Sequence, residues 1–203
     1  MEAACKAQLR TQFLAARRAV PPDVRQAEAA TLKAHVATLA AVTDTVCAYV
    51  PVGSEPGSTA LLDALAGTGV RVLLPISRTS SDGTPQALWW GEYHSEHLAP
   101  AAFGLLEPAG DPLPPGTVAR AGVILVPALA VDRRGVRLGR GAGFYDRSLP
   151  LRNPIARLIA VVRDSELVDE LPGESHDVRM TDALTPAGGF TPLTQQPGMP
   201  ATE

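Results

Sequence analysis

The stretch VCAYVPVGSEPGSTALLDALAGTGVRVLLP, residues 46–75, decides the fold class of this chain. It begins and ends with a short apolar, β-favouring run that stops at a proline, VCAYVP at 46–51 and VRVLLP at 70–75. Between these runs, residues 58–69 have the pattern of a helix, with Ser58 at the N-cap and glycine at the C-terminal end. A strand, a helix and a second strand at this spacing predict a βαβ unit with parallel strands.

The rest of the chain extends this pattern. Two helices are predicted first, over 2–19 and over 23–40 with Asp23 as N-cap, separated by Pro21-Pro22. Further strands are predicted at 86–92, 122–132, 156–162 and 183–186. We therefore expect one α/β domain over residues 1–186, with a mostly parallel central sheet and helices on both faces, a three-layer, Rossmann-like arrangement. Residues 187–203 are rich in Gly, Pro and Thr, and we expect a loosely ordered C-terminal tail there.

Composition excludes several classes of protein. Eighteen Lys and Arg stand against 21 Asp and Glu among 203 residues, a net charge of -3, which argues against a general nucleic-acid binder. Cys5 and Cys47 have no metal-ligand spacing, which indicates reduced thiols. The N-terminal residues lack a signal peptide's apolar core, and no apolar run approaches the roughly 18 residues of a membrane span. We expect a cytoplasmic protein with no membrane partner and no nucleic-acid partner.

The segment RLGRGAGFYDR, residues 137–147, holds the densest chemistry in the chain. Its alternating glycines allow positive φ and a close backbone approach, so that successive N–H groups can surround an anion. Arg137 and Arg140 add forked donors suited to phosphate oxygens. The segment follows a buried strand and precedes a helix predicted to start near Gly143, and ligands of parallel sheets bind beyond the carboxyl ends of strands. This pattern favours a phosphate site over a plain turn, and leaves the turn open.

Other interpretations of this segment are less well supported. It is not a Walker loop, because no GK[ST] follows, and its glycine spacing differs from that of dinucleotide-binding loops. Asp146 is its only carboxylate, and beside bound phosphates such an acid typically holds Mg²⁺. RNA binding is not favoured, because the chain lacks basic patches with interleaved aromatic residues.

Three other places offer candidate side chains. Lys6 and Arg10 are four residues apart and share one helix face, which is either a binding face or a solvated basic surface. Glu55 follows a predicted strand, where binding loops lie. His176 and Asp177 are either a metal or acid–base pair or part of a polar loop.

The segment VPALAVDRRGVRLGRGAGFYDRSL, residues 126–149, strongly resembles the signature of the 5-formyltetrahydrofolate cyclo-ligase (5,10-methenyltetrahydrofolate synthetase) family. Segments similar to other parts of that family follow its order: KAQLR at 6–10, YVPVGSEPGS at 49–58, FGLLEP at 103–108 and LPGESHDVRMTDALTP at 171–186. The resemblance covers about residues 5 to 186. It implies an enzyme that uses ATP and Mg²⁺ to convert 5-formyltetrahydrofolate to 5,10-methenyltetrahydrofolate, ADP and phosphate.

The resemblance also implies roles for individual residues. Arg137 and Arg140 match positions beside the transferring phosphate and would be catalytic. Positions implied to bind ATP are Lys6, Arg10, Arg137, Gly139, Arg140, Gly141, Ala142, Gly143, Phe144 and Tyr145. Positions implied to bind the folate are Val50, Glu55, Arg140, Gly143 and Phe144. Asp146 and Asp177 match Mg²⁺ positions.

This chain departs from the family pattern at two positions of the central segment. Ala142 stands where some members have lysine and others glycine, and Phe144 replaces a frequent tyrosine. The aromatic residue that stacks on the folate rings is open, with Trp89, Trp90 and Tyr93 as candidates. We expect a monomer that acts on ATP and a reduced folate. Two other functions stay open: a sugar-phosphate or CoA-ester enzyme on a similar sheet, and a folate- or nucleotide-binding protein without turnover.

Overall fold

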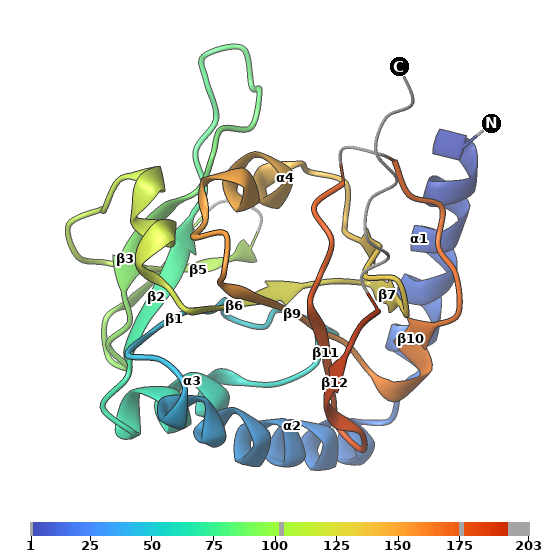
Figure 1. The fold of residues 1–203 in the computed structure, drawn as a ribbon, viewed down its shortest axis with the longest axis horizontal. Helices are drawn as coiled ribbons and strands as arrows, with labels where there is room; N and C mark the ends of the chain where they lie inside the picture. The colour runs from blue at the N-terminus through green and yellow to red at the C-terminus, as the bar shows by residue number, and fades with distance from the viewer. Residues whose placement is uncertain (1, 102–103, 175–176, 195–203) are drawn as a thin grey trace.

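A seven-stranded sheet in the order β12-β11-β9-β6-β1-β2-β3 forms the centre of the protein (Figure 1). The structure is a computed structural model and describes residues 2–101, 104–174 and 177–194. The strands of this sheet are β1 (Thr45–Cys47), β2 (Arg71–Ile76), β3 (Trp89–Glu92), β6 (Val123–Pro127), β9 (Arg157–Val161), β11 (Asp182–Thr185) and β12 (Gly189–Pro192). Strands β11 to β2 are parallel, whereas β12 and β3 at the edges are antiparallel. The predicted parallel βαβ unit is confirmed as β1, α3 (Thr59–Gly67) and β2.

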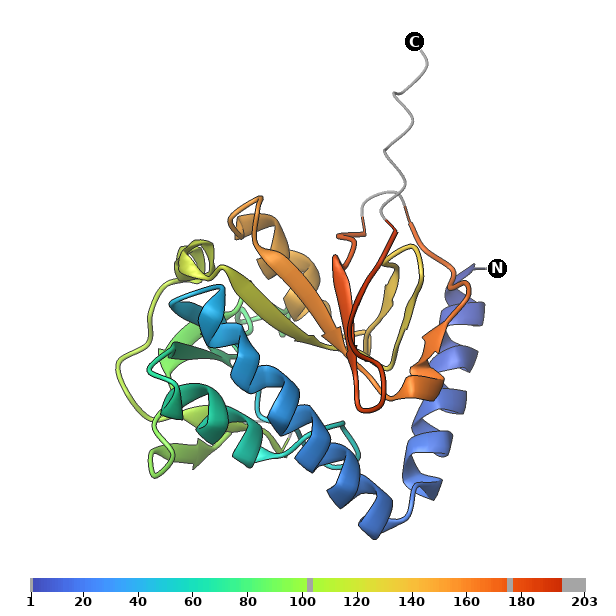
Figure 2. The same ribbon diagram turned by 60° about the horizontal axis from the view of Figure 1, so that its bottom comes forward.

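Helices cover both faces of this sheet, which confirms the expected three-layer arrangement (Figure 2). On one face lie α2 (Pro22–Val36), η1 (Ala37–Ala41) and α3, and their apolar residues pack against alternate strand residues such as Val46. On the other face lie η3 (Pro115–Arg120), α4 (Phe144–Ser148) and η4 (Leu149–Leu151), whose apolar side chains pack against strand residues such as Ile124. The side chains of neighbouring positions along a strand therefore pack into two different apolar cores, one on each face of the sheet.

Helix α1 (Glu2–Ala19) lies outside these layers, at the end of the sheet where β12 and β10 are found (Figure 1). Its residues Leu9, Phe13 and Leu14 pack against a third, smaller apolar cluster that includes Leu129 and Leu138. This cluster belongs to a three-stranded sheet in the order β10-β7-β8, formed by β10 (Leu167–Val168), β7 (Ala130–Asp132) and β8 (Arg137–Leu138). The predicted helix over 2–19 is confirmed.

The prediction of one strand over 122–132 is wrong. The segment forms β6 in the central sheet and β7 in the small sheet, and the chain changes sheets between Pro127 and Ala130. Leu129 N donates to Leu138 O at 2.7 Å, so the chain here pairs with β8 and no longer with β6's neighbours. Both halves are buried, and an apolar run by itself does not distinguish one buried strand from two.

Element ends also differ from the sequence expectations. The helix predicted over 23–40 is α2 followed by the 3₁₀ helix η1; its N-cap is Pro21, so Asp23 lies within the first turn and does not cap. Ser58 occupies the N-cap of α3, yet its side chain makes no capping hydrogen bond. The sheet continues past residue 186, the predicted start of a loose tail, because Asp164 accepts hydrogen bonds from Ala187 N and Gly188 N and the chain returns as β12. Residues 195–203 of that predicted tail lie outside the described residues.

Three short elements complete the fold, and one of them, β5 (Leu106–Pro108), contacts β2 and β3. Strands β4 (Leu98–Pro100) and β5 form a two-stranded antiparallel sheet, and the 3₁₀ helix η5 (Asp164–Glu166) follows β9. No helix within the described ranges is long and apolar enough to cross a membrane.

Candidate active site

A cavity of about 300 Å³ opens beyond the carboxyl ends of β1, β2 and β6. Tyr49 and Val50 follow β1, Ser77 follows β2, and Ala128 follows β6, and all of them line it. The carboxyl ends of parallel strands are the usual place for a ligand in such a sheet. The fold therefore forms a cavity at the edge that the sequence predicted.

Every described residue at a position that the family resemblance implied to bind ATP, folate or Mg²⁺ lines this cavity. These residues are Lys6, Arg10, Val50, Glu55, Arg137, Gly139, Arg140, Gly141, Ala142, Gly143, Phe144, Tyr145, Asp146 and Asp177. They come from α1, from the loop after β1, from the segment that joins β8 to α4, and from the chain before β11. His176, the predicted partner of Asp177, lies outside the described residues.

The basic side chains of α1 form one wall of the cavity. Lys6, Arg10 and Arg17 recur at helical spacing on the same face of the helix, and all three line the cavity. Lys6 Nζ lies 2.8 Å from Glu174 Oε1 and 3.6 Å from Asp177 Oδ2, and the hydrogen bond to Glu174 is the main reason why the pKa of Lys6 is raised. Only 15% of the Lys6 side chain is exposed, so this face is not the solvated surface that the sequence left open.

The glycine-rich segment is held in place by arginines as well as by its own backbone. Gly141 and Gly143 have φ of 94° and 80°, the left-handed region that the sequence analysis expected. Gly139 is needed for space and not for a left-handed backbone, because a Cβ there would lie 2.6 Å from Arg137 Nη1. Arg10 Nε donates to Gly139 O at 2.9 Å and ties the segment to α1. Glycine at 139 therefore makes room for the Arg137 side chain.

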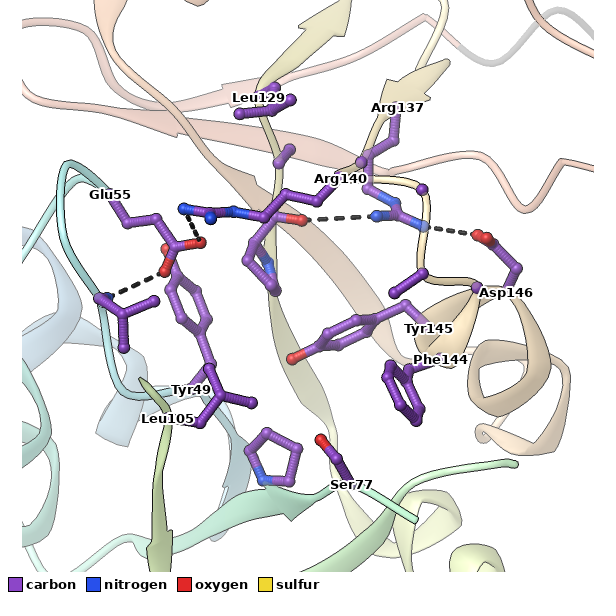
Figure 3. A pocket seen from close by; sticks show the side chains of 18 of the residues that line it. Tyr49, Glu55, Ser77, Leu105, Leu129, Arg137, Arg140, Phe144, Tyr145 and Asp146 are labelled. Carbon is purple, nitrogen blue, oxygen red and sulfur yellow. Dashed lines mark hydrogen bonds and ion pairs between the residues drawn. The ribbon is translucent and has the colours of Figure 1, made fainter. Parts of the chain in front are cut away.

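Four charged side chains form two ion pairs along the cavity wall (Figure 3). Arg137 Nη2 lies 2.6 Å from Asp146 Oδ1, and Arg140 Nη2 lies 3.1 Å from Glu55 Oε1. Glu55 Oε2 also accepts a hydrogen bond from Val52 N at 3.0 Å. Each arginine thus has a carboxylate partner, with which an anionic ligand would compete.

Three aromatic side chains line the cavity beside these charges. In Figure 3 Tyr49, Tyr145 and Phe144 lie below the row of ion pairs. The buried Tyr145 Oη has no hydrogen-bond partner among the described residues. Burial raises the pKa of Tyr145 far above that of an ordinary phenol, although Arg137 opposes the shift, so the hydroxyl stays protonated at neutral pH. Tyr145 therefore offers the cavity a neutral donor.

None of the three aromatic residues that were candidates for stacking on the folate rings, Trp89, Trp90 and Tyr93, lines the cavity. Trp90 belongs to the apolar core and is 1% exposed, and the Trp89 ring lies 4.0 Å from the Arg78 guanidinium carbon. Tyr93 Oη donates to Asp63 Oδ1 at 2.6 Å, next to a separate surface hollow. The candidates Trp89, Trp90 and Tyr93 are therefore wrong for this cavity, because the two rings on β3 and the ring that follows it lie in the core or against other side chains.

Several cavity residues were missed in the sequence. They are Arg17, Tyr49, Val52, Pro75, Ser77, Leu88, Leu105, Leu106, Glu107, Pro127, Ala128, Leu129 and Leu138. A signal existed for Arg17, which continues the face of Lys6 and Arg10, and for Tyr49, which precedes Val50 at a strand end. Most of the others lie in or next to β2, β5, β6 or β8, and local sequence does not indicate that these strands border one cavity.

The carboxylates of the cavity suit a metal ion that is coordinated partly by the protein and partly by the oxygens of a bound phosphate. Asp146 faces Arg137, and Asp177 lies 3.6 Å from Lys6. Within the described ranges no group of three His, Cys, Asp or Glu side chains could hold a metal ion. Mg²⁺ commonly takes one or two carboxylates and completes its shell with water and phosphate oxygens, so the two carboxylates, beside side chains that could bind phosphate, fit it.

Comparison with known proteins agrees with the sequence resemblance. Residues 2–186 match the model of the 5-formyltetrahydrofolate cyclo-ligase family. The chain belongs to this family. The cyclo-ligase of Mycolicibacterium smegmatis is 56% identical over 188 residues, which cover 93% of this chain and 97% of that protein. The cyclo-ligase of Escherichia coli K12 is 29% identical over 175 residues, or 84% of this chain and 94% of that protein. Cyclo-ligases are enzymes, so this cavity is the candidate active site of an enzyme.

Solved structures of cyclo-ligases share the fold. The NMR structure of Aquifex aeolicus 5,10-methenyltetrahydrofolate synthetase matches with a TM-score of 0.71 at 22% identity, over 96% of this chain and 95% of that one. The Mycoplasma pneumoniae 5,10-methenyltetrahydrofolate synthetase matches with a TM-score of 0.65 at 20% identity, over 86% and 94% of the two chains. At these identities the likeness concerns the fold.

Proposed function

We propose that this enzyme uses ATP and Mg²⁺ to convert 5-formyltetrahydrofolate to 5,10-methenyltetrahydrofolate, with release of ADP and phosphate. One observation carries the proposal: residues 137–146, the segment with the strongest family resemblance, share a single cavity with Lys6, Arg10 and Glu55. Arginines suited to phosphate and a carboxylate suited to a pterin N–H edge therefore face the same space. All these groups come from one chain, which supports a monomer as the working unit; sedimentation of the purified protein would test this.

The formyl oxygen is a poor leaving group, and the proposed reaction activates it by phosphorylation. The formyl oxygen attacks the γ-phosphorus of ATP, the bond to the β-phosphate oxygen breaks, and ADP leaves. This forms an N5-iminium phosphate, whose formyl carbon is then attacked by N10. N10 loses its proton, the carbon–oxygen bond breaks, and phosphate departs with the former formyl oxygen. The enzyme needs to position the two substrates and to neutralise the charge in transfer.

The residues of the cavity supply these two functions. Arg137 and Arg140 would donate to the oxygens of the transferring phosphate, each leaving its present carboxylate partner. Lys6 and Arg10 would contact the other ATP phosphates. Asp146 and Asp177 would hold Mg²⁺, which neutralises phosphate charge when bound. Glu55 would accept from the pterin N–H edge, with Val50 and Phe144 packed against the folate.

A single assay tests the proposal. Purified protein is mixed with 5-formyltetrahydrofolate, ATP and Mg²⁺, and absorbance in the methenyl product's band is followed. We expect product only when all three are present, with one ADP formed per product. Substrate labelled with ¹⁸O at the formyl group should place the label in inorganic phosphate. Well-folded protein that binds both substrates and forms no product would be a binding protein, and the proposal would be wrong.

A further inference from the structure

A buried ionic network lies next to the cavity and is not part of the proposed chemistry. Arg17 makes two hydrogen bonds to Glu166, from Nε to Oε1 and from Nη2 to Oε2, both 2.7 Å long. Glu166 Oε2 also accepts from the backbone N of Arg163 at 2.8 Å, and Arg163 Nε donates to Glu28 Oε2 at 2.8 Å. The side chains of Arg17, Glu166 and Arg163 are 1%, 5% and 5% exposed. Burial removes these charged groups from water, which is energetically costly.

The network holds two backbone carbonyls of the cavity wall. Arg163 Nη1 donates to Ser54 O at 3.0 Å, and Arg17 Nη2 donates to Ala128 O at 2.6 Å. Ser54 directly precedes Glu55, and Ala128 itself lines the cavity. The network therefore connects the loop after β1 with the connection between β6 and β7, two walls that are far apart in the sequence.

The contact with Ser54 fixes the orientation of a tight turn. Glu55 N donates to Val52 O at 3.1 Å, and Gly53 within this turn has a φ of 60°. A turn of this kind is local and exposed to movement unless its central peptides are held from outside. Arg163 holds the carbonyl of the peptide that joins Ser54 to Glu55, one peptide away from the Glu55 side chain.

We infer that Arg163 is a positioning residue for the folate end of the cavity, acting through Ser54 O on Glu55. Arg17 has the corresponding function for Ala128, and Glu166 joins the two arginines. The inference rests on the proposed function, because it takes Glu55 as a folate contact. Arginine suits this position because its planar fork can donate to Glu28 and to Ser54 O at the same time, which a lysine ammonium on a flexible stem does less well.

A double-mutant cycle between Arg163 and Glu55 tests the inference. The folate dissociation constant, with a non-hydrolysable ATP analogue present, is measured for wild type, Arg163→Met, Glu55→Gln and the double variant, together with KM for each substrate. We expect Arg163→Met to weaken folate binding by about tenfold and to change KM for ATP by less than about twofold. In the Glu55→Gln background Arg163→Met should cause almost no further loss, because the group it positions is already altered.

Arg157→Met is the matched control. Arg157 begins β9, whereas Arg163 follows the other end of that strand. Arg157 pairs with Asp182 through two hydrogen bonds, of 2.6 and 3.2 Å, outside the cavity lining. This variant should lower the melting temperature and leave folate binding unchanged. If Arg163→Met does not fold, Arg163→Lys replaces it in the same cycle, with a smaller expected loss of folate binding.

The outcomes separate the two proposals. Additive effects of Arg163 and Glu55, or an equal loss of folate and ATP binding, would show that Arg163 only stabilises the fold and would overturn the inference. Wild-type protein that forms no methenyl product would instead contradict the proposed function, and is seen before any variant is made.

Discussion

Arg140 and Glu55 form an ion pair across the cavity, with Nη2 3.1 Å from Oε1, although the proposed reaction uses Arg140 at the transferring phosphate and Glu55 at the pterin. The Glu55 side chain is 9% exposed, whereas that of Arg140 is 48% exposed. Arg140 is therefore the partner that is free to turn away. Binding of a phosphate near Arg140 would release Glu55 for a second ligand, so we expect the ion pair to couple the binding of the two proposed substrates.

Glu55→Gln should weaken folate binding selectively. The amide keeps the size of the side chain but loses the charge that strengthens a hydrogen bond from a pterin N–H, so we expect a rise in KM for folate of about 10- to 100-fold. KM for ATP should change much less. Steady-state kinetics with each substrate varied in turn measures both. Glu92→Gln, which removes a partner of Arg71 outside the cavity, is the control and should have normal kinetics.

Arg140→Ala should lower kcat by about 100- to 1000-fold, because it removes one donor arranged for the transferring phosphate. Stability should hardly change, since the side chain is half exposed. Arg147→Ala is a matched control from the same segment: Arg147 Nη1 donates to Gly143 O at 3.0 Å, and the residue does not line the cavity. Equal kcat in the Arg140 and Arg147 variants would rule out the assigned role of Arg140.

Asp146→Asn should make turnover more dependent on Mg²⁺. A neutral amide binds Mg²⁺ less well than a carboxylate, and it also frees Arg137 from its 2.6 Å ion pair. We expect a lower kcat and a higher Mg²⁺ concentration for half-maximal rate, measured by titration of Mg²⁺ at fixed ATP. Asp169→Asn removes an exposed carboxylate paired with Arg133 and should leave the titration unchanged. A wild-type Mg²⁺ curve for Asp146→Asn would contradict the metal assignment.

Tyr145→Phe should have opposite effects on stability and on catalysis. The buried hydroxyl has no partner among the described residues, so its removal should leave the free energy of unfolding unchanged or raise it by up to about 1 kcal/mol. If a ligand accepts a hydrogen bond from Tyr145, kcat/KM should fall. Tyr93→Phe is the reverse case: it loses the bond to Asp63, so urea denaturation should show about 1 kcal/mol of destabilisation with normal kinetics.

Asp164→Asn should reduce stability in a pH-dependent way. Burial by itself would raise the pKa of Asp164, but hydrogen bonds from Thr185, Ala187 and Gly188 outweigh it and lower the pKa. A lowered folded-state pKa stabilises the protein above the unfolded value of about 3.9, and this stabilisation is lost as pH falls through the folded pKa. Urea midpoints of wild type and variant should therefore differ at pH 7 and converge as pH falls below the unfolded value of about 3.9. A constant difference would show that the charge is not involved.

Local sequence predicted the central architecture because each element has a local signal. The short apolar runs of β1 and β2 on either side of the helix α3 were sufficient for a parallel βαβ unit, and the glycines at 141 and 143 were sufficient for the left-handed turns. The division of residues 122–132 between two sheets was not predictable, because β7 depends on pairing with β8 and β10. The return of the chain as β12 likewise depends on Asp164, which is remote in the sequence from the turn that it holds.

The sequence by itself determined the chemistry that is present: arginines between glycines after a buried strand, acids near strand ends, and basic residues on one face of α1. Only the tertiary structure decided which of these groups meet. It brings Arg140 to Glu55, Lys6 to Asp177 and Arg163 to the carbonyl of Ser54. The physical reason is that such contacts depend on how parallel strands and α1 pack over long sequence separations, and local periodicity carries no information about that packing.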